Sequence, residues 1–301
     1  MDGADVKHNH GFPHDKTAFA NVEWCSRGAH LIHSVLKAIR ILKTFSSDQP
    51  VLTLSELSRR LGYPKSTIHT LISTLESQGL IERAGAGSYA LGTGIIPITQ
   101  AVRVNAQLRD RAAPLLREVG DYCGESVYLT ILDGAFCLYI YAIESSHRLL
   151  ARTAVGERAF LHCTSVGKAL LAFLPEQRVQ QIVREVGLPR FTERTITDPA
   201  ALARDLAETR RRGYSLDEGE HEIGTFCVGA PIFTERGDVV ASCSVSGPAP
   251  EIVAGRLSDL APRIVSAAEE ISRRLGFVPK AGAPYLRGSP APPQGTRASS
   301  D

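Results

Sequence analysis

Apolar positions recur at helical spacing in the first third of the chain, and short polar turns separate them. The segment "HSVLKAIRILKTFSS" puts a set of apolar residues on one face of a helix. This set consists of Val35, Leu36, Ile39, Leu42 and Phe45. The spacing therefore predicts a first core helix that packs through that face.

Two further helices are predicted directly after it. The sequence "TLSE" from Thr53 to Glu56 fits a capping box and opens a short helix that ends at Gly62. Pro64 suits the first turn of the next helix, which Gly79 ends. Its predicted inner face consists of Ile68, Leu71, Ile72 and Leu75. Two helices joined by a tight turn that contains glycine make a helix-turn-helix pattern.

The segment "LIERAGAGSYALG" predicts two short strands around a glycine-rich turn at residues 84–88. Three helices followed by such a hairpin predict a winged helix-turn-helix. A helical pattern from about residue 95 to 116 then predicts a linker helix.

After Gly124 the pattern changes to strands mixed with helices. The segment "SVYLTILDGAFCLYIYAIE" predicts two strands around an Asp-Gly turn, and "CVGAPIFTERGDVVASCSVSG" predicts a second hairpin. Helices are predicted at about 165–174, 176–186, 199–212 and 251–275. The second domain is therefore expected to be α+β, with helices around a largely antiparallel sheet.

The expected domain organisation has five parts. These are a disordered tail at 1–28, a winged helix-turn-helix at 29–93, a linker helix at 94–116, a second domain at 117–277 and a disordered tail at 278–301. Both ends are polar or rich in Pro, Gly and Ser, which favours disorder. Four histidines near the start also permit a metal-binding tract: His8, His10, His14 and His30. Polar termini of this composition are, however, more often disordered than metal-binding.

Composition restricts the class of protein. A chain of 301 residues with 43% hydrophobic residues can bury two cores. The net charge of +2 does not by itself indicate a polyanionic partner. Six cysteines without a C-x-x-C pair suit reduced, buried thiols, and there is no long apolar run or signal peptide. We therefore expect a cytoplasmic protein without a membrane partner.

The start of the predicted second helix of the helix-turn-helix carries small polar and basic side chains. In a DNA-binding helix-turn-helix this part of the helix meets base edges in the major groove. The candidate base-contacting residues are Lys65, Ser66, Thr67, His69 and Thr70, and Arg59, Arg60 and Arg83 are candidates for phosphate contacts. The alternative is a winged helix that acts only through protein partners, because such domains also serve as interaction modules.

Taken together, four motifs resemble the IclR family of bacterial transcriptional regulators over residues 30–276. They are "LSELSRRLGYPKSTIHTLISTLESQGLIER" with "YALG", then "LHCTSVGKALLAFLP", "GYSLDEGEHEIGTFCVGAPIF" and "GDVVASCSVSGP". The resemblance implies a winged helix-turn-helix that binds operator DNA, a linker helix that helps to form a homodimer or homotetramer, and a GAF-like effector-binding domain. It also implies control of metabolic genes by a small metabolite.

Carried over by residue, the resemblance implies an effector cavity lined by Ser165, Val166, Gly167, Asp217, Cys227, Ser244 and Ser246. Two positions depart from the family pattern. Thr70 stands where arginine is common, which alters the expected operator preference, and Phe226 stands where arginine is frequent before Cys227.

The residues themselves favour an anionic ligand. "CTSVGKALLAF" puts Ser165 and Val166 at the entrance to a helix, where unpaired N–H groups attract a carboxylate. Serine hydroxyls at 244 and 246 can donate hydrogen bonds, and Asp217 can accept one from a ligand hydroxyl or hydrate. An ordinary capped core helix without a ligand remains the alternative.

Other chemistry is less well supported by the sequence. A cysteine nucleophile with a base would draw on His162, Cys163, His221 and Cys227, but the strand context of Cys227 fits a buried small residue better. The same four residues are possible zinc ligands, but they lack the close-spaced ligand pair typical of structural zinc. "TSVGKAL" lacks the first glycine of a P-loop and has Ala169 at the magnesium position. We therefore expect no catalytic residues, no cofactor and no metal site.

Overall fold

The structure, a computed structural model, describes residues 31–46, 49–102, 105–145, 155–248, 252 and 255–278. The chain divides into two compact units, with the boundary in the sequence between Asn105 and Ala106. The tails predicted at 1–28 and 278–301 lie outside the described residues, apart from residue 278, and so does the histidine-rich segment.

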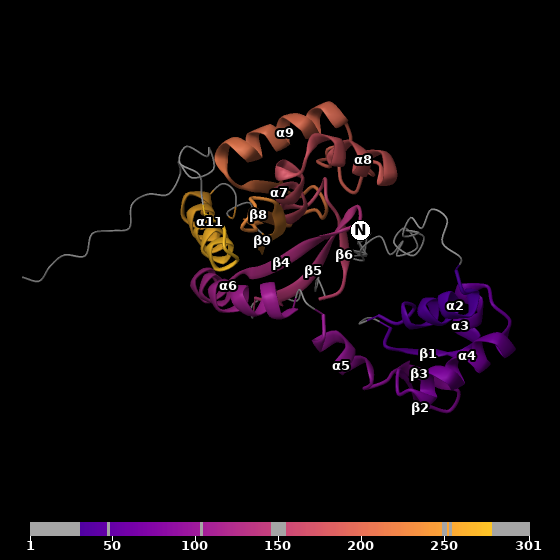
Figure 1. The fold of residues 1–301 in the computed structure, drawn as a ribbon. Coiled ribbons are helices and arrows are strands. Elements are labelled where there is room, and N and C mark those ends of the chain that lie inside the picture. The colour runs from indigo at the N-terminus through magenta and orange to yellow at the C-terminus, as the bar shows by residue number, and fades with distance from the viewer. Residues whose placement is uncertain are drawn as a thin grey trace, which may run out of the picture. The chain divides into compact units, whose positions relative to one another are not determined.

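The N-terminal unit is a three-helix domain with a small sheet (Figure 1). Its helices are α2 (His33–Leu42), α3 (Leu54–Leu61) and α4 (Lys65–Ser77). The strands β1 (Val51–Thr53), β2 (Ile81–Gly85) and β3 (Ser88–Leu91) pair antiparallel in the order β1-β3-β2. The predicted helix-turn-helix and hairpin are confirmed, whereas β1 was not predicted from the sequence.

The predicted capping box is present at the start of α3. The side-chain hydroxyl of Thr53 accepts a hydrogen bond from the backbone N–H of Glu56 at 3.2 Å, and the Glu56 carboxylate accepts one from the N–H of Thr53 at 2.8 Å. Gly62, with φ of 69°, ends the helix in the left-handed conformation that glycine adopts without strain. Local sequence alone therefore sets both ends of α3.

The buried face of α2 differs from the predicted one. Ile41 and Phe45 are buried in the core of the unit, with Leu42 partly buried beside them, whereas Val35 and Ile39 are 52% and 42% exposed. The helix carries two adjacent apolar stripes, and helical spacing does not show which one packs inward. The prediction was wrong for Val35 and Ile39, and the second stripe lies on the surface.

The helix expected over 94–116 is not continuous. Helix α5 (Ile95–Gln100) ends early, and a π-helical turn (Asn105–Arg109) leads into α6 (Asp110–Cys123), which extends beyond the predicted end. Leu108 and Leu116 are buried in the C-terminal unit, where α6 packs against β4 and α11. Packing, rather than the local pattern, therefore assigns the second half of the predicted linker to the second domain.

The C-terminal unit is built on a six-stranded antiparallel sheet in the order β6-β5-β4-β9-β8-β7. The strands are β4 (Ser126–Asp133), β5 (Phe136–Ile143), β6 (Arg158–Phe160), β7 (Ser215–Glu218), β8 (Phe226–Phe233) and β9 (Val239–Gly247). The helices are α6, α7 (Ser165–Phe173), α8 (Glu176–Val186), α9 (Pro199–Arg212) and α11 (Leu257–Arg274). The α+β fold class is confirmed.

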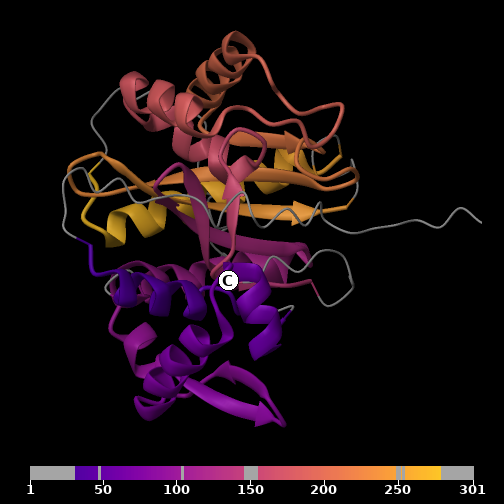
Figure 2. The same cartoon turned by 90° about the vertical axis from the view of Figure 1, so that its right-hand side faces the viewer.

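Helices cover both faces of this sheet (Figures 1 and 2). Gly229 of β8 faces α7, because a Cβ added there would lie 2.9 Å from the backbone of Ser165. The next residue, Ala230, lies with residues of α11 around a small cavity, as alternation along a strand requires. α7 therefore lies on one face of the sheet, with α11 on the other.

Candidate DNA-binding face and effector cavity

The solvent-facing side of α4 holds the side chains predicted to meet DNA. Lys65, Ser66, His69 and Thr70 are exposed, while Thr67 is half-buried. Helix α4 begins after Pro64 with no side-chain cap, so its first N–H groups are available to a phosphate. The same exposed face continues through Ser73, Thr74 and Ser77, which the sequence reasoning did not include.

The turn before α4 is held in place by contacts from both preceding helices. Arg40 of α2 donates to the Tyr63 hydroxyl at 2.9 Å, and the Lys37 ammonium lies 5.3 Å from the centre of the Tyr63 ring. Ser58 of α3 donates to the Tyr63 carbonyl at 2.6 Å. These contacts fix the angle between α3 and α4, and therefore the direction in which Lys65 projects.

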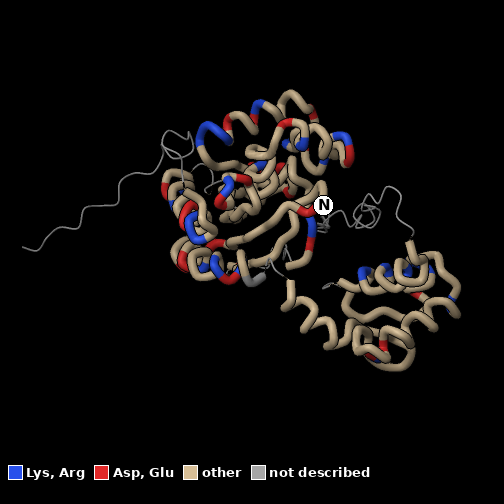
Figure 3. The backbone as a smooth tube through the Cα atoms, viewed as in Figure 1, with Lys and Arg blue, Asp and Glu red and all other residues tan. Residues whose placement is uncertain are grey.

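The predicted phosphate-contacting arginines are all exposed. Arg60 donates to the Gln49 side chain at 2.5 Å, and Arg83 of β2 forms an ion pair with Glu76 of α4 at 2.9 Å. Residues 31–102 contain seven Lys or Arg and four Asp or Glu, whereas both signs are interspersed over the C-terminal unit (Figure 3). The local surplus of positive charge thus lies in the domain with the helix-turn-helix.

The start of α7 is held against the sheet by hydroxyl groups. Ser215 of β7 donates to the Ser165 carbonyl at 2.6 Å, and Ser242 of β9 donates to the Val166 carbonyl at 2.8 Å. The Thr164 hydroxyl accepts from the N–H of Gly167 at 3.1 Å as the helix cap. The N–H groups of Ser165 and Val166 precede the first intrahelical bond, and neither has a hydrogen-bond partner among the described residues.

A cavity of about 110 Å³ lies at this helix start, on the face of the sheet that α7 covers. Its wall contains six of the seven residues predicted for an effector: Ser165, Val166, Asp217, Cys227, Ser244 and Ser246. The structure thus brings together side chains that are up to 81 positions apart, from Ser165 to Ser246. Their role toward a ligand stays a prediction.

Gly167, the seventh predicted residue, is not part of the cavity wall. A Cβ at this position would lie 2.3 Å from the carbonyl oxygen of Leu161, so only glycine allows the chain before α7 to pack this closely. Close packing against Leu161 therefore explains why the motif has glycine at position 167.

Sequence reasoning missed several other residues that line the cavity. Tyr128 of β4 and Tyr139 of β5 form an edge-to-face pair with ring centres 5.4 Å apart, and both line the cavity. Arg158 of β6 and His221 also line the cavity. Strand alternation could have put Tyr128 on the inner face, but no sequence signal places β4 beside β9.

Burial makes the thiols and imidazoles near the cavity poor catalysts. It raises the pKa of the Cys163 and Cys227 thiols well above the usual range, so the reactive thiolate is suppressed. Burial lowers the pKa of His221 to about 4, with His162 contributing. Among the described residues, no group of three His, Cys, Asp or Glu side chains is arranged to hold a metal ion.

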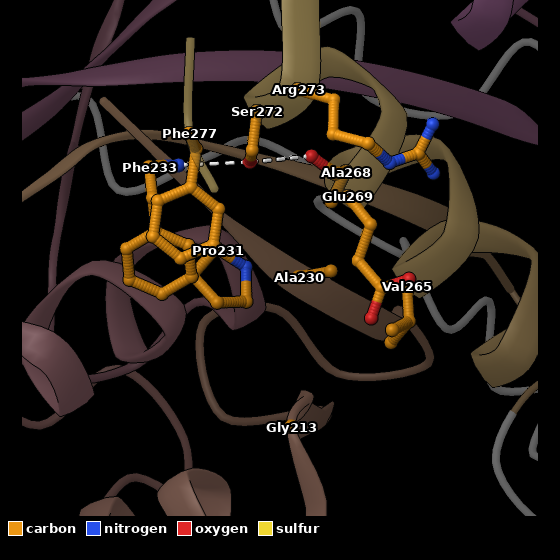
Figure 4. Close-up of a pocket in the computed structure, with 10 residues that line it drawn as sticks. All are labelled: Gly213, Ala230, Pro231, Phe233, Val265, Ala268, Glu269, Ser272, Arg273 and Phe277. Carbon is orange, nitrogen blue, oxygen red and sulfur yellow. Dashed lines mark hydrogen bonds between the residues drawn. The ribbon is translucent and has the colours of Figure 1, made fainter. Parts of the chain in front are cut away.

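A second, smaller cavity of about 40 Å³ lies between α11 and β8 (Figure 4). Its wall is mostly apolar and includes Phe233 and Phe277. Ser272 accepts from the N–H of Phe233 at 3.0 Å and donates to the Ala268 carbonyl at 2.7 Å, so its hydroxyl is already satisfied. This volume holds roughly two or three water molecules, which leaves the larger cavity as the candidate ligand site.

Family models match both units of the chain. The model described as the IclR helix-turn-helix domain matches residues 34–85, and the model described as the bacterial transcriptional regulator IclR C-terminal domain matches residues 100–273. The chain belongs to the IclR family of transcriptional regulators. The helix-turn-helix of this regulator is a DNA-binding domain, as predicted from α4.

Similar regulators are known from several bacteria. The transcriptional repressor IclR of Escherichia coli is 30% identical over 248 residues, which span 81% of this chain and 90% of the relative. The regulator BhcR of Paracoccus denitrificans is 37% identical over 230 residues, 76% of this chain and 82% of the relative. These homologues are transcriptional regulators and not enzymes.

Solved structures share the fold across both units. Thermotoga maritima IclR has a TM-score of 0.67 and 30% identity, with 81% of this chain and 99% of the other covered. An IclR homologue of Microbacterium hydrocarbonoxydans in complex with 4-hydroxybenzoate has a TM-score of 0.74 and 27% identity, with 80% and 98% covered. No helix in the described part of the chain is long and apolar enough to span a membrane.

Proposed function

We propose that this regulator senses a small carboxylate in the cavity beside α7 and changes its affinity for operator DNA in response. The observation that carries the proposal is the pair of N–H groups of Ser165 and Val166, which lie at the positive end of α7 beside a cavity that these two residues line. The hydroxyls of Ser244 and Ser246 add donors on the same wall. The 4-hydroxybenzoate complex of the Microbacterium homologue supports an organic acid as the ligand class.

The size of the cavity restricts the ligand. A cavity of roughly 150 Å³ accommodates benzene, so 110 Å³ suits an acid of roughly five non-hydrogen atoms. The Tyr128 and Tyr139 rings form an apolar part of its wall.

A thermal-shift screen tests the ligand class. The panel is acetate, propionate, pyruvate, lactate and 4-hydroxybenzoate, and binding of any of them should raise the melting temperature. Ser165→Trp fills the cavity and should abolish the shift while leaving DNA binding intact. A shift that survives Ser165→Trp would place the ligand elsewhere and contradict the assignment of the cavity.

We infer that the protein acts on DNA as at least a dimer, because one short recognition helix contacts too few base pairs for useful specificity. Exposed apolar residues support this: Val35 and Ile39 of α2, Leu31 and Ile32 just before it, and Ile96 and Ile98 of α5. A monomer at micromolar concentration by ultracentrifugation that still binds its operator tightly would refute it.

Action on operator DNA is tested on the DNA beside the regulator's own gene. A footprint should show a protected site with two half-sites, and an acid that binds should change the affinity by about 1–3 kcal/mol. Binding without sequence preference, or no binding at physiological salt, would instead favour action through protein partners only.

A further inference from the structure

Behind the cavity lies a buried cluster that contains more carboxyl groups than cations. Lys168 of α7 is 1% exposed, and its ammonium lies 2.5 Å from Glu220 Oε1 and 3.4 Å from Asp205 Oδ2. Asp217 belongs to the same cluster and is 2% exposed. Two carboxyl groups thus pair with one ammonium, and the third lies near enough to interact with it electrostatically.

Backbone hydrogen bonds offset only part of this excess. Asp217 Oδ1 accepts from the N–H groups of Gly219 and Glu220 at 3.1 and 2.8 Å. Glu220 Oε2 is buried and has no hydrogen-bond partner among the described residues. A buried carboxylate with an unpaired oxygen is costly, so a further negative charge next to this cluster requires compensation.

The other groups around Asp217 supply little positive charge. From β6, Arg158 lines the cavity but forms an ion pair with Asp133, and Glu157 is its neighbour. From the loop after β7, His221 is neutral because burial lowers its pKa to about 4, and Glu222 is acidic.

From the strands, the Cys227 thiol and the Tyr139 hydroxyl stay protonated because burial raises the pKa of each well above its usual range. Burial and Glu220 together raise the pKa of Asp217 itself to about 7. Asp217, which lines the cavity, therefore gains or loses its proton near neutral pH.

We propose that the cavity binds a small carboxylate together with one proton, which Asp217 takes from solvent and donates as a hydrogen bond to the ligand. This inference rests on the proposed function, and it reverses the acceptor role that the sequence suggested for Asp217. A neutral Asp217 removes one negative charge from the cavity wall and adds a donor beside the N–H groups of Ser165 and Val166. The regulator then responds to an acid most strongly when the pH is low.

Isothermal titration calorimetry tests the inference with the five acids of the panel and their neutral amides. Between pH 7.5 and 8.5 the dissociation constant of an acid should rise about tenfold per pH unit, whereas that of a neutral amide should stay constant. Titrations in two buffers of different ionisation enthalpy should count one proton taken up per acid bound at pH 8.5. This count uses the unaltered protein, so it does not depend on a variant folding.

Asp217→Asn imitates the protonated side chain. At pH 8.5 this variant should bind the acid within a few-fold of the affinity that the unaltered protein shows at pH 6, and without pH dependence. Glu218→Gln is the matched control, because Glu218 is the next residue of β7 and is exposed. It should keep the original pH dependence.

The outcomes separate this inference from the proposed function. An acid that binds with the same affinity at pH 6 and 8.5, or without proton uptake at pH 8.5, overturns the inference and leaves the effector site standing. Loss of binding at pH 6 in a folded Asp217→Asn shows that the ionised side chain is needed and also overturns it. If no acid of the panel binds even at pH 6, both the carboxylate effector and the inference are wrong.

Discussion

Replacing Asp217 by Asn should change how the stability of the C-terminal unit depends on pH, even without ligand. Asp217 is 2% exposed, and its Oδ1 accepts two backbone hydrogen bonds that an amide oxygen can also accept. The substitution therefore removes a titrating group with little change in shape.

The size of the effect follows from the pKa. Burial raises the pKa of Asp217 from 3.8 to about 7, so the folded protein holds a proton that the unfolded chain releases between about pH 4 and 7. Over this window the folded state binds more protons, and the free energy of unfolding falls as pH rises. A shift of roughly three pKa units, at about 1.4 kcal/mol each, amounts to about 4 kcal/mol.

The pH dependence of the free energy of unfolding is measured by urea titrations from pH 4.5 to 8, with circular dichroism as the probe of folding. The free energy of unfolding of the unaltered protein minus that of Asp217→Asn should fall across the window and stay constant above pH 7.5. His221 has a lowered pKa and contributes with the opposite sign, but it is present in both proteins. A difference that is flat with pH, or that also appears with Glu218→Gln, would refute the reasoning.

Three further predictions concern other parts of the molecule. Lys65→Ala should weaken operator binding and reduce the salt dependence by roughly one unit of slope in gel-shift titrations, and an unchanged slope would remove Lys65 from the phosphate contacts. Val35→Glu should shift sedimentation toward monomer without lowering the melting temperature, since Val35 is 52% exposed. Gly167→Ala should lower the free energy of unfolding, measured in urea, by about 1–3 kcal/mol, because the added Cβ would lie 2.3 Å from the Leu161 carbonyl oxygen. Gly120→Ala, where the nearest atom at 3.3 Å is a side-chain methyl, should be far milder.

The sequence by itself determined the elements whose signals are local. The capping box at Thr53, the stop at Gly62 and the strand pair around Gly134 depend on residues that are neighbours in the chain, so they could be predicted from it. The order of four family motifs was enough to predict the family and the winged helix-turn-helix fold. Six residues of the cavity wall followed from the same resemblance, not from periodicity.

Only the tertiary structure decided which of two apolar stripes of a helix is buried and where the predicted linker helix is divided. The α2 helix has two apolar stripes of similar character, and only packing against α4 selects Ile41 over Val35. The predicted linker helix is divided into two parts because Leu108 and Leu116, in its second half, are buried in the C-terminal unit.

The cavity depends on contacts between distant strands in the same way. The sheet order puts β4 beside β9, which brings Tyr128 opposite Ser244 although 116 positions separate them in sequence. The ion pairs of Lys168 with Glu220 and Asp205, close to Asp217, likewise exist only after α7, α9 and β7 with the turn that follows it have packed together. Burial in that packed interior, not the residue type, shifts the pKa of Asp217, and no pattern along the chain encodes it.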